Sequence, residues 1–127
     1  MEWNFRSDQP IYAQLVEQIE QGIVSGAFPP GGRLPSVRDL AMEAGVNPNT
    51  MQRALQELER DGMVYSQRTA GRFVTEDAAI IERTKGAFAE KLIRSFLDGM
   101  SRLGYSREEI LALLQEEKEE QNGDPDM

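Results

Sequence analysis

The chain alternates between stretches with apolar residues at helical spacing and short stretches rich in glycine and proline. The first helical stretch, 10–25, places Ile11, Leu15 and Ile19 on one side, which predicts a helix that buries that side. Asp8 is the expected N-cap of this helix, because an aspartate there accepts hydrogen bonds from first-turn N–H groups. The FPPGG motif that follows predicts a loop, and the RLP after it predicts a short extended segment.

Two further helices are predicted close together, with a tight turn between them. The first has Ser36 as its N-cap and ends at Gly45. The second begins at Asn47 and ends before Gly62, and its proline falls at the first helical position, where a missing N–H costs nothing. Two short helices joined in this way are typical of the helix-turn-helix motif.

A β-hairpin is predicted directly after the third helix. The segment 63–74, MVYSQRTAGRFV, places two short apolar strands on either side of a polar turn. A hairpin in this position makes the motif a winged helix-turn-helix. The sequence therefore predicts a mainly α fold with a small β wing, and a winged helix-turn-helix DNA-binding domain over residues 1–75.

The rest of the chain predicts two helices and a polar tail. A long helix over 77–103 carries a wide apolar stripe, and the SREE motif at 106–109 is a capping box for a last helix. We interpret 76–118 as a C-terminal two-helix dimerisation region, in preference to a ligand pocket, and 119–127 as a disordered acidic tail. The residues expected in the dimer core share one side of the long helix: Ile81, Phe88, Leu92, Phe96, Met100 and Leu103.

Composition narrows the classes of function. The chain has no cysteine and no histidine, so it has neither disulfides nor a triad built on those residues, and a zinc site would need carboxylates alone. We therefore predict no catalytic residue, no metal site and no cofactor, and do not expect an enzyme. No apolar run reaches membrane-spanning length and the N-terminus lacks a secretory pattern, so we expect a cytoplasmic protein that does not bind membranes.

The distribution of charge leaves room for a surface that binds a polyanion. The formal net charge is -8, of which residues 1–75 contribute −2 and residues 76–127 contribute −6. Within 32–75, six arginines outnumber five acidic residues. An evenly acidic protein would bind DNA poorly, whereas this segregation permits one locally basic face.

The predicted third helix has a polar face opposite its apolar stripe. At about 100° per residue, Asn49 and Arg53 lie on that face with Gln52 beside them. Asparagine and glutamine pair with adenine, and arginine pairs with guanine or phosphate. The first-turn N–H groups favour a phosphate near Asn47 and Thr50.

Arginines on the neighbouring elements distinguish this face from an ordinary solvated helix, which would carry similar residues. Arg38 lies near the junction of the second and third helices, and Arg68 and Arg72 lie at the hairpin turn. In a winged helix-turn-helix these positions surround the same groove, which is where duplex binding requires cations.

The segment 31–74, GGRLPSVRDLAMEAGVNPNTMQRALQELERDGMVYSQRTAGRFV, resembles the DNA-binding domain of the GntR family of bacterial transcription regulators. The resemblance covers 9–75, and the LPSVRDLA and VNPNTMQRAL motifs are its most specific parts. The short C-terminal part looks like that of the YtrA subfamily, in which a two-helix tail serves in dimerisation. Genes for regulators of that subfamily often lie beside genes for ABC transporters.

The resemblance also implies which positions contact DNA. It assigns the arginine of the PSxR motif and five positions of the third helix to that role, and it places a glycine in the wing. Together with the arginines and the helix cap found above, the predicted DNA-binding residues are Ser36, Arg38, Asn47, Asn49, Thr50, Gln52, Arg53, Arg68, Gly71 and Arg72.

The wing departs from the family's usual Gly-x-Gly-Thr-Phe-Val pattern. Thr69 replaces the first glycine and Arg72 replaces the threonine. The Cβ of Thr69 stands where the family's backbone approaches the minor groove. We expect Arg72 to compensate by reaching a phosphate, and the base preference of relatives does not transfer.

These observations predict a homodimeric, sequence-specific transcription regulator, a repressor, bound to an inverted-repeat operator and controlling an ABC transporter operon. Its expected partners are double-stranded DNA and a second copy of itself, and a small-molecule effector of unknown identity remains open. The alternative is a winged-helix protein-interaction module without specific DNA binding. The acidic balance favours that alternative, and the two family motifs oppose it.

Overall fold

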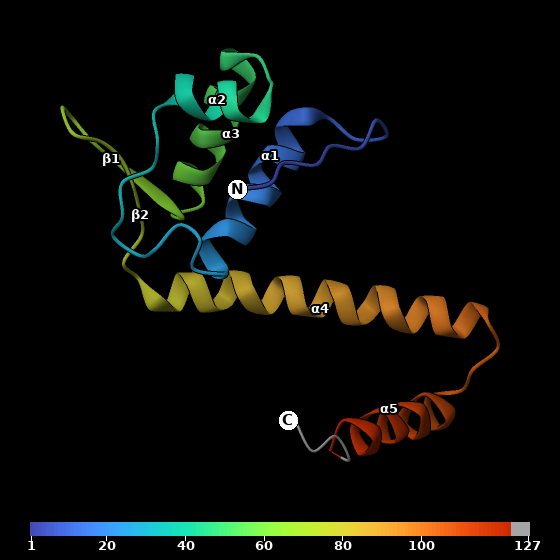
Figure 1. Ribbon diagram of the computed structural model, residues 1–127. Coiled ribbons are helices and arrows are strands. Elements are labelled where there is room, and N and C mark those ends of the chain that lie inside the picture. Colours follow the sequence, from blue (N-terminus) through green and yellow to red (C-terminus); the bar gives the residue numbers. More distant parts are fainter. Residues whose placement is uncertain (123–127) are drawn as a thin grey trace. The chain divides into compact units, whose positions relative to one another are not determined.

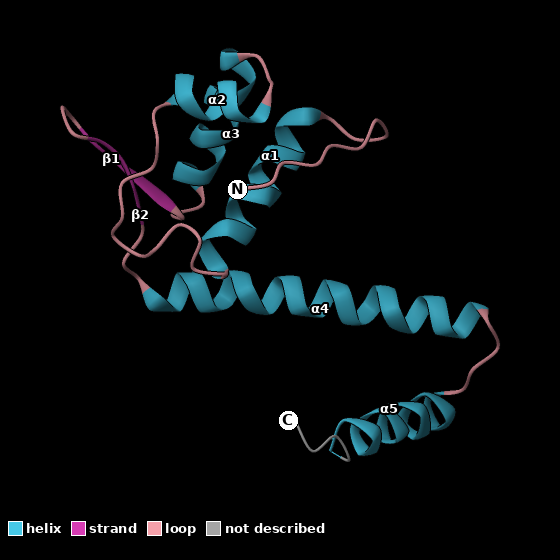
Figure 2. Ribbon diagram, viewed as in Figure 1, coloured by secondary structure: helices cyan, strands magenta, loops and turns pink. Residues whose placement is uncertain are grey.

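The structure is a computed structural model that describes residues 1–122, with side chains described as far as residue 117. The chain forms two compact units, Met1–Ala87 and Phe88–Met127, and the division falls inside a helix. The elements, in chain order, are α1 (Ile11–Val24), α2 (Val37–Ala44), α3 (Pro48–Arg60), β1 (Val64–Gln67), β2 (Gly71–Val74), α4 (Ala78–Arg102) and α5 (Arg107–Asn122) (Figures 1 and 2). Among the described residues, no helix combines the length and the apolar character that crossing a membrane requires.

The predicted boundaries of α2 and α3 are confirmed by their caps. The Ser36 hydroxyl accepts a hydrogen bond from the Asp39 N–H at 3.1 Å, and the Asn47 side chain accepts one from the Asn49 N–H at 2.8 Å. Gly45 ends α2 in the left-handed conformation, with φ of 71°, which glycine adopts without strain. The turn between the two helices is therefore fixed by local chemistry on both sides.

The core of the first unit forms where the apolar sides of α1, α2 and α3 meet the base of the hairpin. The predicted stripe of α3 is buried there, as are Leu15 and Ile19 of the α1 stripe, whereas Ile11 at the start of α1 is 38% exposed. The core consists of Leu15, Ile19, Ile23, Leu34, Leu40, Ala41, Met51, Ala54, Leu55, Leu58, Met63, Val64 and Val74. Burial of this apolar surface drives the three helices into one arrangement and leaves their polar sides in water.

The wing is a two-stranded antiparallel sheet. Val64 pairs with Val74, and two residues further along the hairpin Ser66 pairs with Arg72. The predicted extended RLP segment is confirmed on the other edge of β2. There Arg33 forms an isolated bridge with Phe73, and the N–H of Leu34 donates to the Arg72 carbonyl at 2.9 Å.

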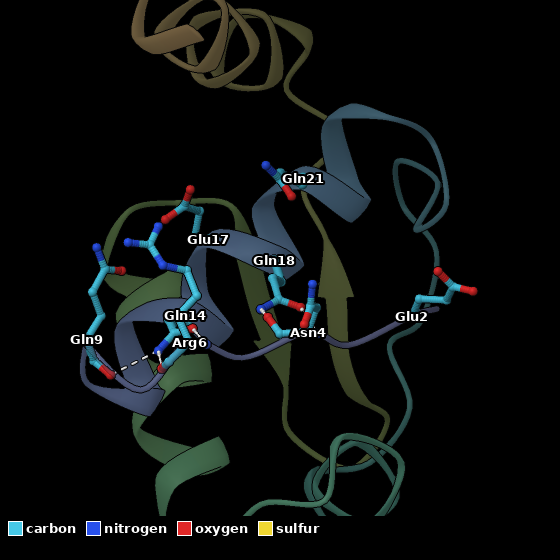
Figure 3. Close-up of a pocket in the computed structure, with 8 residues that line it drawn as sticks. All are labelled: Glu2, Asn4, Arg6, Gln9, Gln14, Glu17, Gln18 and Gln21. Atoms are coloured by element: carbon cyan, nitrogen blue, oxygen red, sulfur yellow. Dashed lines mark hydrogen bonds between the residues drawn. The ribbon is translucent and has the colours of Figure 1, made fainter. Parts of the chain in front are cut away.

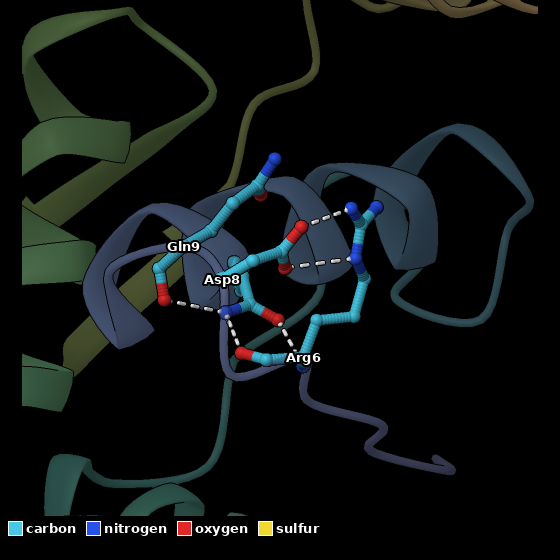
Figure 4. Close-up of polar contacts among 4 residues, drawn as sticks. Arg6, Asp8 and Gln9 are labelled. Atoms are coloured by element: carbon cyan, nitrogen blue, oxygen red, sulfur yellow. Dashed lines mark hydrogen bonds and ion pairs between the residues drawn. The ribbon is translucent and has the colours of Figure 1, made fainter.

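The prediction that Asp8 caps α1 is wrong. The N-cap residue is Pro10, which has no side-chain capping bond, and Asp8 lies two residues earlier. The Asp8 carboxylate instead binds the Arg6 guanidinium, with contacts of 3.1 and 2.6 Å (Figure 4). Helix α1 therefore begins without a side-chain cap, and Gln14 of α1 binds the backbone of Arg6 in the segment that precedes the helix.

Two glutamines of α1 hold the N-terminal arm, residues 1–9, along the helix. The Gln14 amide binds both the N–H and the carbonyl of Arg6, each at 2.7 Å. The Gln18 amide binds the corresponding groups of Asn4 at 3.1 and 2.7 Å. A polar hollow of about 310 Å³ lies between the arm and α1 (Figure 3).

Alternate residues of the arm face the core. Trp3 and Phe5 stack with ring centroids 6.4 Å apart and pack against the buried cluster. The Trp3 indole N–H also donates to Glu43 of α2 at 3.3 Å. The arm therefore joins α1 to α2.

The second unit contains the later part of α4 and the whole of α5. The predicted capping box at the start of α5 is confirmed, because the Ser106 N–H donates to Glu109 at 2.9 Å and the Glu109 N–H donates back to Ser106 at 3.2 Å. Helix α5 continues to Asn122, into the segment for which the sequence predicted a tail. Residues 123–127 of that predicted tail lie outside the described residues.

Candidate nucleic-acid interface

Helix α3 presents its polar side because its apolar side is locked in the core. Its four buried residues are at most 1% exposed: Met51, Ala54, Leu55 and Leu58. Rotating the helix would bring these side chains into water, so the opposite side is fixed in orientation. That side carries Asn49, Arg53, Gln56 and Arg60, all exposed, with Thr50 and Gln52 half-buried beside it.

The start of α3 uses part of its polar inventory for capping. The Asn47 side-chain oxygen is engaged by the Asn49 N–H, so its NH₂ group is what remains for a contact outside the helix. Asn49 uses only its backbone in this bond, and its exposed side-chain amide has both a donor and an acceptor to offer. Of the two predicted asparagines, Asn49 is therefore better placed to read a base.

Arg53 stacks on an aromatic ring of a different helix. Its guanidinium carbon lies 3.6 Å from the centroid of the Tyr12 ring in α1. This cation–π contact orients the guanidinium group while leaving its positive charge intact. The N–H donors around the edge of the plane stay available for a guanine or a phosphate.

Two predicted phosphate contacts lie at the start of α2. The Ser36 hydroxyl accepts the capping bond and retains its own hydrogen, which can be donated to a phosphate oxygen. Arg38 is exposed and makes no hydrogen bond or ion pair within the described part of the chain. Its charge is therefore uncompensated by the protein.

The wing tip carries an exposed cation and a glycine that the backbone requires. Arg68 is exposed in the hairpin turn beside Thr69. Gly71 has a φ of 107°, where a side chain would strain the backbone, and a Cβ there would lie 3.1 Å from the Arg33 Nε. The exposed Arg33 therefore passes close to the wing backbone and adds a second cation to this surface.

The structure places Arg72 against the protein, although the sequence suggested a contact with phosphate. Its Nε donates to the Glu59 carboxylate at the end of α3, and its side chain is only 18% exposed. The Ser66 hydroxyl donates to the same carboxylate oxygen at 2.6 Å. Arg72 thus forms an ion pair within the protein, unlike the exposed Arg38 and Arg68.

These bonds also change the acidity of Glu59. Partial burial alone would raise its pKa, but the hydrogen bonds from Ser66 and Arg72 together with the positive charge of Arg72 lower the pKa of Glu59 below its usual value. The carboxylate therefore stays ionised near neutral pH, and it neutralises Arg72.

Sequence reasoning missed four residues of this region: Tyr12, Arg33, Glu59 and Ser66. Arg33 had a detectable signal, because it is a cation beside the predicted extended segment. The other three gave none, since their partners lie on different elements of the chain. Only packing brings α1 beside the polar side of α3, and only the hairpin register aligns Ser66 with Arg72.

The six residues expected in a dimer core do not share one environment. Ile81 is half-buried against the core of the first unit. Phe88 and Met100 are half-buried. Leu92, Phe96 and Leu103 are exposed by 71%, 43% and 74% respectively.

The second unit has an open apolar groove between α4 and α5. Its volume is about 530 Å³. The lining consists of Ile93, Phe96, Leu97, Arg107, Ile110, Leu111 and Leu114. Several large apolar side chains of this lining are exposed, among them Ile93 at 58% and Leu111 at 60%.

Comparison with known proteins identifies the relatives of the chain. Residues 11–74 match the family described as bacterial regulatory proteins, gntR family. The HTH-type transcriptional regulator YhcF of Bacillus subtilis is 40% identical over 111 residues, which cover 87% of this chain and 92% of that protein. The HTH-type transcriptional repressor YtrA of the same organism is 37% identical over 95 residues, 73% of each chain.

Solved structures share the same arrangement. A GntR family transcriptional regulator from Listeria monocytogenes has a TM-score of 0.80 and 40% identity, covering 88% of this chain and 98% of that one. The DNA-binding domain of AraR, solved in complex with operator ORX1, has a TM-score of 0.54 and 30% identity. It covers 59% of this chain and 96% of that domain. The predicted winged helix-turn-helix fold with a C-terminal helical region is thereby confirmed.

Proposed function

Because the chain belongs to the gntR family of bacterial regulatory proteins, in its YtrA-like branch, and is a DNA-binding transcription regulator, we propose that it represses transcription as a homodimer on an inverted-repeat operator. The observation that carries the proposal is the fixed polar side of α3, flanked by exposed arginines of α2 and the wing. The name of one relative, a transcriptional repressor, supports the sign of regulation.

In this proposal α3 lies in the major groove and reads bases with Asn49, Gln52 and Arg53. Amides recognise adenine and arginine recognises guanine through paired hydrogen bonds. Ser36, Arg38 and Arg68 bind phosphates on either side of the groove and set the register of the helix. Asn47 and Thr50 lie at the helix start, where N–H groups favour a phosphate.

Dimerisation is proposed through the second unit. Its exposed leucines, Phe96 and the groove between α4 and α5 need cover from another apolar surface. A second copy offers the same face, and a two-fold dimer matches an inverted repeat with one α3 for each half-site. Ile81 is excluded from this surface, because it packs in the first unit.

The competing function is a winged helix that binds a protein instead of DNA. The net charge of -8 favours it, because an acidic chain is repelled by phosphates. The separation of charge answers this objection: the exposed cations gather near α3, while the excess of acid lies beyond residue 75.

The test is selection of genomic DNA fragments by the purified protein at two salt concentrations. A specific regulator enriches an inverted repeat that survives moderate salt, and the neighbouring genes show whether the target is a transporter operon, as the resemblance suggests. DNA affinity falls steeply with salt, whereas an apolar protein interface does not respond in that way.

Arg38→Ala provides the control for this test. It removes an exposed cation that has no partner among the described residues, so folding should be unaffected. We expect weaker binding to all fragments and a smaller salt dependence, by about one counterion. A folded Arg38→Ala protein that binds the selected fragments as tightly as the unmodified protein would count against the proposed docking.

A further inference from the structure

We propose that Glu59 is a positioning residue that fixes the wing to α3 and keeps Arg72 out of the set of DNA contacts. The inference deepens the proposed DNA-binding function and rests on it. It assigns a role to an acidic residue on the recognition helix, where an acid would otherwise repel the phosphates that the neighbouring cations bind.

The alternation of side chains along the hairpin places Ser66 and Arg72 on its inner face. Val64 and Val74 are paired at the base of the hairpin, and both are almost completely buried in the core. Two residues further out, side chains point to the same face, and there Ser66 pairs with Arg72. The apolar attachment of the wing thus ends at the valines, and the next rung is attached through polar groups.

Glu59 supplies the attachment point from α3. A single carboxylate oxygen accepts hydrogen bonds from Ser66 on β1 and from Arg72 on β2. Both strands are therefore tied to the same atom of the helix. Charge-assisted bonds of this kind are shorter and stronger than neutral ones, so they resist rotation of the wing about its base.

The backbone of Arg72 is held from the opposite edge. Its carbonyl accepts a hydrogen bond from the Leu34 N–H at 2.9 Å, and Leu34 is buried in the core. With its backbone fixed on one side and its guanidinium group fixed on the other, Arg72 connects the segment before α2, the wing and α3. These bonds fix the orientation of the hairpin, and Arg68 lies at its tip.

The environment of Arg72 also distinguishes it from Arg53. Arg53 rests on a neutral ring and keeps its charge, whereas Arg72 is mostly buried beside an ionised carboxylate. A neutralised pair releases few counterions when DNA binds. Arg72 should therefore contribute little to the salt dependence, to which each phosphate contact adds a slope of about 0.9.

The test is a double-mutant cycle with Glu59→Gln, Arg72→Gln and the combination, measured on the selected operator and on unrelated DNA across a range of salt. Glutamine matches glutamate in size and retains an acceptor at position 59, and at position 72 it is shorter than arginine but retains a donor; in both places it removes the charge. We expect either single change to lower the ratio of operator to unrelated affinity by about tenfold, the equivalent of one charge-assisted bond. The double variant should be no worse than the singles, because the two residues act as a unit.

The salt slope separates positioning from direct contact. Arg72→Gln should leave the slope unchanged, whereas Arg68→Gln, the matched control at the exposed tip, should reduce it by about 0.9. A comparable reduction for Arg72→Gln, with tighter binding by Glu59→Gln, would show that Arg72 contacts phosphate and would overturn the proposal.

A measurement without DNA separates failure of this inference from failure of the proposed function. Hydrogen exchange of the β1 and β2 amides should be faster in Glu59→Gln and Arg72→Gln than in Arg68→Gln. Unchanged exchange would overturn the attachment of the wing through Glu59. Faster exchange with an unchanged operator ratio would overturn the positioning role in DNA recognition, because the bonds of Glu59 would then only stabilise the wing. Failure of the unmodified protein to select any operator would reject the proposed function itself.

Discussion

The two units of the chain treat apolar residues in opposite ways. The first unit buries thirteen apolar residues in one core and turns amides and arginines of α3 outward. In the second unit, among the described side chains from Phe88 onward, only Ile110 is buried. Leu92, Leu103 and Leu111 are each at least 60% exposed there.

One set of apolar residues therefore forms a core within the chain, whereas the other is left largely exposed to solvent. The stripe of α3 and most of the stripe of α1 are covered within the first unit. Helix α4, by contrast, has no fully buried residue along its 25 positions.

Leu55→Ala should damage the first unit most. Leu55 is 1% exposed, and removing a buried leucine side chain costs about 2–5 kcal/mol in the free energy of unfolding. Urea denaturation followed by the fluorescence of Trp3, the single tryptophan, measures the loss, because Trp3 packs against that core. Gln56→Ala, at the exposed neighbouring position, should change stability by less than about 0.5 kcal/mol. Equal losses for both variants would contradict the packing described for α3.

Phe96→Asp should weaken the self-association proposed for the second unit and leave the first unit folded. A charge on this exposed apolar face should weaken self-association by at least about thirtyfold, as for an interface hot spot. Analytical ultracentrifugation measures the dissociation constant, and Trp3 fluorescence monitors the first unit. Ser95→Asp adds the same charge at the adjacent exposed position and should have a much smaller effect. A dimer that survives Phe96→Asp would place the dimer interface elsewhere.

Tyr12→Leu should weaken DNA binding without unfolding the first unit. Loss of the aromatic face beneath Arg53 removes an interaction of about 1 kcal/mol, which corresponds to roughly fivefold in operator affinity. Tyr12→Phe keeps the ring and should bind almost normally. Fluorescence anisotropy with labelled operator compares the two, and equal affinities for the leucine and phenylalanine variants would refute a role of α1 in orienting Arg53.

The smallest expected effect is the dependence of the first unit's stability on pH. Because the pKa of Glu59 is lowered in the folded state, its stabilising contribution is complete above the unfolded value of about 4.3 and is lost as pH falls through the folded pKa. The contribution should be below about 1 kcal/mol, as for a partly exposed ion pair. Thermal denaturation between about pH 5 and pH 3 should show a shallower decline for Glu59→Gln than for the unmodified protein. The same decline in both proteins would contradict an ionised Glu59 that stabilises the folded state.

Much of the fold was predictable because local chemistry specifies it. Ser36, Asn47 and Ser106 each bond to an N–H within three residues, so these helix starts follow from neighbouring positions in the sequence. The cap assigned to Asp8 failed because two other residues competed: Pro10 occupies the N-cap position, and Arg6 takes the carboxylate.

The candidate DNA-binding site was likewise predictable only in part from the sequence. Helical spacing alone placed Asn49 and Arg53 on the solvent side of α3, opposite the buried stripe. The same spacing did not predict that Arg53 rests on Tyr12 or that Arg72 faces Glu59. The face of the hairpin to which an arginine side chain points depends on strand register and on packing. The sequence alone therefore does not show which face that is.

The starts of α2, α3 and α5, the apolar sides of the helices and the family resemblance can all be read from the sequence alone, because capping and periodicity act over a few residues. The tertiary structure decided which arginines remain free for a polyanion and which apolar stripe stays uncovered. Those outcomes depend on the packing of α1 against α3, on the register of the wing and on whether another part of the chain packs against the apolar side of α4. Such contacts join residues far apart in the chain, and no short-range pattern records them.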